Sequence, residues 1–186
     1  MLKIIGIIAG ILAVGVIGVL AYAATVPDTF QVRRSVSIKA APEKVFPLIN
    51  ELKTMNEWNP FAKQDPTIRL TYSGPAAGKG AANDWDSDGK AGKGRLEITD
   101  STRPSQVTMR LDMEKPMEGH NTVAFALQPQ AQGAQGADVG TQVTWSMTGP
   151  MPYIAKVICT FVSMDRMIGG EFEKGLAALK TMAEKR

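Results

Sequence analysis

The spacing of hydrophobic and polar residues changes twice along the chain. Residues 4–24 are apolar or small and carry no charge, and a helix of that length would rise about 31 Å, the thickness of a bilayer's hydrocarbon core. From Phe30 onward, apolar residues alternate with polar ones, which is typical of half-buried strands. In residues 153–185 they recur at steps of three and four, which predicts an amphipathic helix.

The alternating segments predict a sheet of about seven strands. They lie at residues 30–38, 68–72, 83–87, 95–99, 107–114, 123–127 and 142–148. Two short helical segments, one opening at Pro42 and one over residues 55–59, separate the first strand from the second. Residues 128–140 are rich in Gln, Ala and Gly and predict a flexible surface loop. Strands joined by tight turns form an antiparallel sheet with one covered face, and we expect the final helix to cover it.

The final helix has two features that its periodicity does not explain. Ser163 is a polar residue before a fresh periodic run, so the helix can break there. Gly169, Gly170 and Gly175 each cost about 1 kcal/mol relative to Ala inside a helix. Glycines fit such positions where another segment approaches the backbone closely, or where a bend or a hollow is needed.

Several short motifs, in this order, resemble the polyketide cyclase/dehydrase and lipid-transport superfamily, the START-like or SRPBCC group. The motifs lie at residues 41–50, 58–61, 85–87, 92–94, 140–145 and 167–176. The resemblance covers about residues 30–184. It implies an α+β helix-grip fold, in which a curved antiparallel sheet surrounds a long C-terminal helix with a hydrophobic cavity between them. The same fold hosts carriers, cyclases and hydrolase activators, so the resemblance specifies the fold and leaves the function open.

The chain divides into an N-terminal membrane anchor, residues 1–26, and a START-like ligand-binding domain, residues 27–186. A signal peptide is the alternative, because Ala21-Tyr22-Ala23 resembles a small-residue cleavage site. The apolar stretch exceeds the roughly 7–15 residues of a signal core, which favours a retained single-pass anchor. Charges flanking the segment discriminate poorly between the two orientations. A short basic N-terminal tail usually stays in the cytoplasm, so we expect the domain outside the cytoplasmic membrane, in the periplasm if the host has one.

Composition narrows the classes of function. The 186 residues carry a net charge of only +3, spread along the chain, so we expect no nucleic-acid partner. Cys159 is the single cysteine and His120 the single histidine, which excludes an intrachain disulfide, a cysteine metal cluster and a histidine pair. We therefore predict no metal and no cofactor. The oligomeric state is left open.

Two motif-like stretches are interpreted as ordinary turns. Residues 84–89 match the first six positions of an EF-hand loop, but Arg95 occupies the twelfth position and the flanks are predicted strands. Residues 74–80 have one spacer too few for a phosphate-binding loop and lack the Ser or Thr after Lys79.

The main hypothesis is membrane-tethered binding of a hydrophobic or lipid-like small molecule, as a carrier or a sensor. Several methionines fall on or beside the predicted inner surfaces and suit a cavity of irregular shape: Met109, Met113, Met147, Met164 and Met167. Arg34 shares the face of apolar neighbours, so either a bulge carries it to solvent or it needs an anionic partner. The candidate ligand-binding residues are Arg34, Trp58, Tyr72, Trp85, Met109, Phe125, Trp145, Ile168 and Phe172.

Two alternatives remain. One is a cyclase- or dehydratase-like enzyme using the same cavity, which would need an inward acid or base such as His120. No residue is nominated as catalytic, and a binding protein is favoured over an enzyme. The other is a non-catalytic interaction domain with a packed core, whose partner binds at the sheet edge or at residues 128–140.

Overall fold

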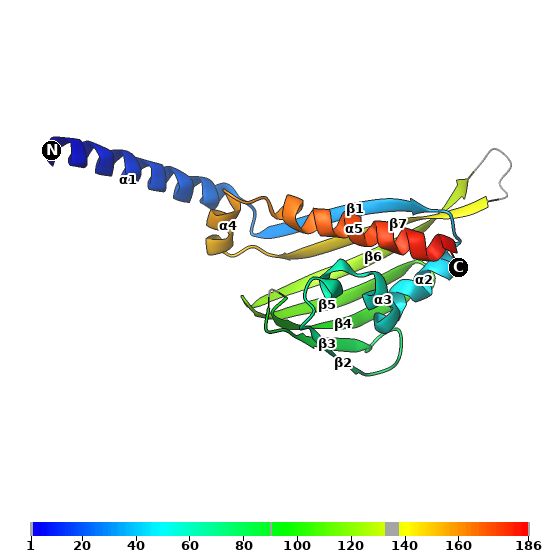
Figure 1. The fold of residues 1–186 in the computed structure, drawn as a ribbon. Helices are drawn as coiled ribbons and strands as arrows, with labels where there is room; N and C mark the ends of the chain where they lie inside the picture. Colours follow the sequence, from blue (N-terminus) through cyan, green and yellow to red (C-terminus); the bar gives the residue numbers. More distant parts are fainter. Residues whose placement is uncertain (1, 90, 133–137, 186) are drawn as a thin grey trace.

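The computed structural model describes residues 2–89, 91–132 and 138–185. The chain begins with the apolar helix α1 (Leu2–Thr25), which projects away from the remainder of the molecule (Figure 1). The strands are β1 (Thr29–Ile38), β2 (Arg69–Ser73), β3 (Ala82–Asp86), β4 (Lys93–Thr102), β5 (Gln106–Lys115), β6 (Gly119–Gln132) and β7 (Asp138–Pro150). The other helices are α2 (Pro42–Asn50), α3 (Leu52–Trp58), the 3-10 helix η1 (Pro60–Lys63), α4 (Tyr153–Cys159) and α5 (Met164–Lys185).

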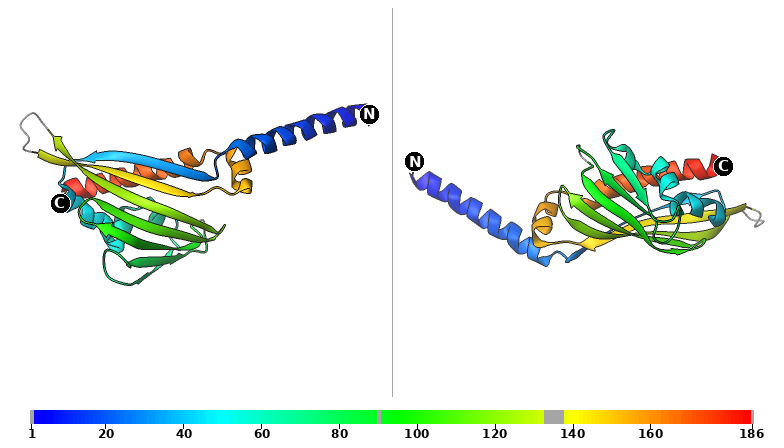
Figure 2. Two further views of the ribbon diagram at one scale, coloured as in Figure 1. Left: turned by 180° about the vertical axis from the view of Figure 1, so that it is seen from behind. Right: turned by 90° about the horizontal axis from the view of Figure 1, so that it is seen from below.

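The seven strands form one sheet in the order β1-β7-β6-β5-β4-β3-β2, with every neighbouring pair antiparallel. Strands β2 to β7 therefore make a meander, and β1 joins its edge beside β7. The sheet curls, and α2, α3 and α5 lie on the same concave face (Figure 2). The α+β helix-grip fold and the seven-stranded antiparallel sheet predicted from the sequence are confirmed.

The predicted long C-terminal helix is two helices. α4 ends at Cys159 and α5 begins at Met164, so the break falls beside Ser163 as expected. The Ser163 hydroxyl accepts a hydrogen bond from the backbone N–H of Arg166 at 3.3 Å, as an N-cap residue does. Ser163 therefore starts a new helix and allows α4 to take its own direction.

The prediction of a loop over residues 128–140 is wrong at both of its ends. β6 and β7 stay paired from Gln128↔Gln142 to Gln132↔Asp138. Residues 133–137 lie outside the described residues. The two strands pair through backbone hydrogen bonds, which form whatever the side chains are. The Gln- and Ala-rich composition therefore does not indicate how far the paired register extends.

We call the end of the sheet where β1 begins and β7 ends the anchor end, because α1 leads directly into it. There Thr29 pairs with Pro150, and Thr122, near the start of β6, pairs with Thr148. α2 begins at the opposite end, close to the C-terminus of α5 (Figure 1).

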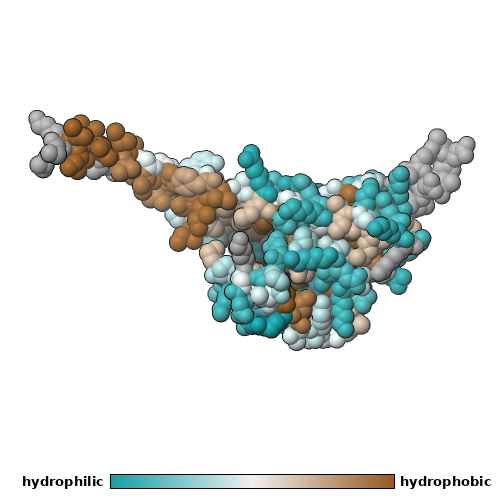
Figure 3. Space-filling model, viewed as in Figure 1, coloured by the Kyte–Doolittle hydropathy of each residue, from teal (hydrophilic) through white to brown (hydrophobic). Residues whose placement is uncertain are grey.

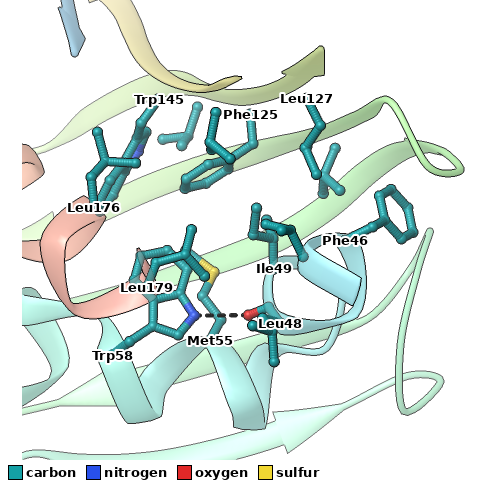
Figure 4. Packing of buried hydrophobic residues seen from close by; sticks show 14 of the residues in the cluster. Phe46, Leu48, Ile49, Met55, Trp58, Phe125, Leu127, Trp145, Leu176 and Leu179 are labelled. Atoms are coloured by element: carbon teal, nitrogen blue, oxygen red, sulfur yellow. Dashed lines mark hydrogen bonds between the residues drawn. The ribbon is translucent and has the colours of Figure 1, made fainter. Parts of the chain in front are cut away.

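The hydrophobic core fills the concave face away from the anchor end. There α2 and α3 insert large side chains between the sheet and α5, and each buried side chain of this size contributes about 1.5–3 kcal/mol. The indole nitrogen of Trp58 donates a hydrogen bond to the Leu48 carbonyl oxygen at 2.8 Å, so its polar atom is satisfied. The packed side chains include Phe46, Ile49, Met55, Trp58, Phe125, Leu127, Leu176 and Leu179 (Figure 4).

Candidate ligand-binding cavity

The anchor half of the concave face is hollow. A cavity of about 610 Å³ lies between the sheet and the first turns of α5. α2 packs in the opposite half, and α3 and η1 border the cavity through Met55, Asn56 and Phe61, so the space between these walls is left open. The apolar side chains that line the cavity include Phe61, Ile68, Trp85, Leu96, Leu111, Met113, Val123, Trp145, Met147, Met167, Ile168 and Phe172.

The polar groups in the cavity wall are amides. Asn56, Asn59, Gln64 and Asn83 line the cavity, and no described lining residue carries an ionisable side chain. Asn59 is 8% exposed, and its side-chain oxygen accepts the backbone N–H of Phe61 at 3.2 Å. The lining can therefore remove apolar surface from water and offer neutral hydrogen-bonding groups.

Three aromatic rings separate the cavity from the packed core; we call Phe61, Trp145 and Phe172 the aromatic wall. The rings of Trp145 and Phe172 stack with centroids 4.1 Å apart and planes 9° apart. Phe61 meets each of them edge to face at 6.3 Å. Gly175 makes room for this arrangement, because a Cβ there would lie 2.7 Å from the Trp145 ring and 2.9 Å from Pro60.

Two polar atoms beside the cavity lack hydrogen-bond partners among the described residues. They are the Asn83 side-chain oxygen and the Trp145 indole nitrogen, and both are fully covered. Leaving such a group unpaired costs about 1–3 kcal/mol. Because other side chains cover them, a ligand reaches these atoms only if the wall shifts.

Four of the nine predicted ligand-binding residues line the cavity: Trp85, Trp145, Ile168 and Phe172. The indole nitrogen of Trp85 donates to the Ala91 carbonyl oxygen at 3.1 Å, which fixes the ring against the β3–β4 turn. That these four side chains contact a ligand stays a prediction.

Three other nominated residues belong to the packed core. Trp58, Met109 and Phe125 are at most 2% exposed and do not line the cavity. Phe125 and Trp58 both pack against Trp145, so they support the aromatic wall from behind. Any effect of these residues on a ligand passes through the position of that ring.

Arg34 has the anionic partners that one of its two interpretations required. Its guanidinium pairs with Asp165 at 2.9 Å and Glu173 at 2.7 Å, both on α5. The hydrogen bonds from Arg34 hold the pKa of Asp165 below its ordinary value. Gly169 lies against this guanidinium. Arg34 therefore ties β1 to α5 and does not line the cavity.

Tyr72 and His120 do not line the cavity either. Tyr72 borders a separate hollow of about 280 Å³, and its hydroxyl accepts a hydrogen bond from the Asn56 amide at 3.0 Å. The His120 side chain is exposed, and its Nδ1 lies 2.8 Å from the Asp112 carboxylate. The hydrogen bond with His120 is the main reason that the pKa of Asp112 is lowered.

Several of the lining residues were not among the candidates predicted from the sequence. Leu111 and Phe61 were not candidates, although Leu111 alternates on β5 in step with Met109 and Met113. That alternation could have predicted that Leu111 faces the cavity. Of the five methionines assigned to inner surfaces, Met113, Met147 and Met167 line the cavity, whereas Met109 and Met164 do not.

Residues 29–184 match the family model described as polyketide cyclase / dehydrase and lipid transport. The chain belongs to this family. The resemblance predicted from the motifs is therefore confirmed, and the family implies a ligand-binding helix-grip domain for a hydrophobic small molecule. No curated protein matches the chain.

Solved structures support the same fold. Protein CV1439 from Chromobacterium violaceum is 12% identical with a TM-score of 0.55, over 85% of this chain and 99% of that one. Norcoclaurine synthase from Thalictrum flavum, solved with dopamine and hydroxybenzaldehyde, is 7% identical with a TM-score of 0.63, over 89% and 92%. At these identities the likeness shows the fold alone.

The N-terminal helix is long and apolar enough to cross a membrane. The candidate span is Ile4–Thr25, with a mean hydropathy of 2.8 and no part of its most apolar stretch buried in the molecule. A membrane anchor and a signal sequence both fit these properties. Among the described residues, no group of three or more His, Cys, Asp or Glu is placed to hold a metal ion.

Proposed function

We propose that this protein binds a neutral hydrophobic or lipid-like molecule in the cavity, as a carrier or sensor held at a membrane by α1. The observation that carries the proposal is the apolar cavity of about 610 Å³, a size typical of small-molecule sites. Affinity would come from removing apolar ligand surface from water, at about 25 cal/mol per Å².

The lining supports a ligand without a charge in its enclosed part. An ion placed among these apolar and amide groups would lose its hydration without gaining an opposite charge. Gln64 is exposed at the edge of the cavity, where it can hydrogen-bond a polar end of the ligand. A long apolar body with one uncharged polar end fits this arrangement.

The tether is supported by α1. Its large side chains are exposed, with Ile11 at 66% and Val14 at 71%, and such a surface is stable in a bilayer and not in water. We propose that the anchor is retained and that the domain lies outside the cytoplasmic membrane. The domain would then stay beside the bilayer, which is a source of apolar ligands.

The two alternatives have less support. The enzyme hypothesis relied on an inward acid or base, and His120 lies outside the cavity lining. A packed-core interaction domain would have no internal void at the centre of the fold, and here the anchor half of the concave face is hollow.

The test is ligand retention by the full-length protein purified from membranes. Organic extraction and mass spectrometry should find one apolar compound class in near-stoichiometric amount.

A pair of variants tests the position of the binding site. Met113→Trp places an indole in the cavity, whereas Thr122→Trp adds the same group on the exposed side of the neighbouring strand. We expect Met113→Trp to weaken binding of a pyrene-labelled fatty alcohol at least about tenfold, which corresponds to 1.4 kcal/mol, and Thr122→Trp to leave it unchanged. Equal binding by both variants would refute the proposal.

A further inference from the structure

The anchor end of the domain carries an exposed apolar surface. Among the described residues outside α1, every exposed large hydrophobic side chain except Tyr72 lies at this end. Ile154 and Ile158 are one helical turn apart on α4, so they share a face. Phe161 is 74% exposed. We define the apolar patch as Ile154, Ile158, Phe161, Val162, Met167 and Met117.

The apolar patch continues the surface of α1. Figure 3 shows hydrophobic surface running from the projecting helix onto the neighbouring part of the domain. The Tyr153 hydroxyl donates a hydrogen bond to the Leu20 carbonyl oxygen at 2.8 Å, which joins α4 to α1 directly. Ala23 is completely buried. The two apolar surfaces are therefore parts of one surface.

A second contact fixes the orientation of α4. The Lys156 ammonium group donates a hydrogen bond to the Asp28 carboxylate at 2.6 Å, and the Met151 N–H donates to the Asp28 carbonyl oxygen at 2.7 Å. Lys156 is 6% exposed, so it lies toward the protein, away from the exposed Ile154 and Ile158. α4 thus has one polar attachment to the segment after α1 and one free apolar face.

The depth of α4 along the span matches the bilayer interface. Leu20 lies five residues before the end of the span at Thr25, which is about 7.5 Å along a helix. Helices that lie in the interface bury their apolar face about 5–10 Å into the boundary between headgroups and acyl chains. Tyrosine, with an apolar ring and a polar hydroxyl, is enriched at that boundary, and Tyr153 occupies this position.

We propose that the apolar patch is seated in the interface of the same bilayer that α1 spans, so that the cavity opens onto the membrane. This inference rests on the proposed tether. Met167 both lines the cavity and belongs to the apolar patch, and Pro116, in the turn beside Met117, lines it too. The occupant of the apolar patch is lipid, and an apolar ligand passes between bilayer and cavity without crossing bulk water.

The test measures the depth of single labels on the full-length protein in lipid vesicles. In a Cys159→Ser background, an environment-sensitive fluorophore is attached at Phe161→Cys, at Ile158→Cys and at Met117→Cys. Ala177→Cys is the matched control, since Ala177 is exposed on α5 about 15 Å from Met167. The vesicles are phosphatidylcholine, with nitroxide-labelled lipids as quenchers.

We expect blue-shifted emission and quenching at the three patch positions and neither effect at Ala177. If the protein floats with the vesicles but the patch labels stay unquenched, the inference is wrong while the tether stands. The inference is also wrong if the label at Phe161→Cys is unquenched and the same variant, left unlabelled and treated with a thiol oxidant in the vesicles, forms disulfide-linked dimers. If the protein does not float with the vesicles, both the tether and this inference fail.

Discussion

At the scale of single residues, three glycines of α5 that look alike in the sequence have different surroundings. Gly175 faces the Trp145 ring and Pro60, Gly169 faces the Arg34 guanidinium, and Gly170 faces open space. The sequence indicated that close approaches or a hollow were needed, but helix periodicity could not say which glycine met which neighbour.

These surroundings predict opposite effects for two identical substitutions. Gly170→Ala should raise the free energy of unfolding by up to about 1 kcal/mol, because Ala favours the helix and the added methyl group meets nothing within 4 Å. Gly175→Ala should lower it by about 1 kcal/mol or more, because overpacking typically costs 1–3 kcal/mol. Denaturant unfolding in detergent measures both. If Gly175→Ala stabilised the protein as much as Gly170→Ala, the aromatic wall would not be packed as described.

Met109 and Met113 show how far the site could be predicted from the sequence. Both lie on the inward face of β5, and alternation identified that face correctly. Only Met113 lines the cavity, because Met109 lies in the part of the core that α2 and α3 fill. A period of two gives the side of the sheet and contains no information about how far a helix from elsewhere in the chain extends over it.

At the scale of elements, most of the order was predictable because its signals are local. Turn residues and alternation separated the strands, and Ser163 marked the break between α4 and α5. The length of the β6–β7 hairpin was not predictable, since it depends on pairing register. The direction of α4, which precedes the break, was not predictable either. It depends on the contacts of Tyr153 with α1 and of Lys156 with the segment that follows α1.

The Arg34 ion pairs join two elements that are far apart in the chain, and their contribution should depend on pH. The pKa of Asp165 is held below its ordinary value of 3.8 because Arg34 donates hydrogen bonds to it. A carboxylate with a lowered pKa stabilises the fold above that ordinary value, and the stabilisation is lost as the pH falls and the group is protonated.

Arg34→Gln should therefore lower the denaturant midpoint at pH 7, and the difference from the parent protein should shrink as the pH falls from 5 to 2. Arg33→Gln is the control, since Arg33 is the exposed neighbour on the opposite face of β1. It should change the midpoint little at either pH. A difference for Arg34→Gln that stays constant with pH would show that the ion pairs with α5 do not carry the effect.

At the scale of the whole molecule, three features meet at one end. The apolar helix α1, the exposed apolar patch and the hollow half of the concave face all lie at the anchor end, although they come from residues as distant as Leu20, Met113 and Phe161. The sequence indicated the apolar N-terminal helix and the inward face of the sheet, but the exposed patch was not predicted. Helical periodicity placed Ile154, Ile158 and Phe161 on the stripe expected to cover the sheet, whereas α4 leaves them exposed. The three features lie close together because of the antiparallel topology. It places the start of β1, the end of β7 and the β5–β6 turn at the same end of the sheet.

This arrangement bears on whether α1 is retained or removed as a signal sequence. Ala23, the last residue of the cleavage-like Ala21-Tyr22-Ala23 stretch, is fully buried, so a chain cleaved after Ala23 would lose a packed residue of the folded protein. Cleavage there would also remove Leu20, the hydrogen-bond partner of Tyr153. We therefore expect the protein isolated from membranes to keep α1.

Intact mass spectrometry of the protein from the membrane and the soluble fractions decides this point, with Ala21→Leu as the matched variant. Ala21 is exposed, so a leucine fits there without disturbing the packing, but it removes the small residue that signal cleavage requires. If α1 is an anchor, both proteins should have the full-length mass, differing only by the substitution. A parent protein that begins after Ala23, together with an uncleaved Ala21→Leu variant, would identify α1 as a signal sequence. The proposal that α1 holds the apolar patch at a bilayer would then be wrong.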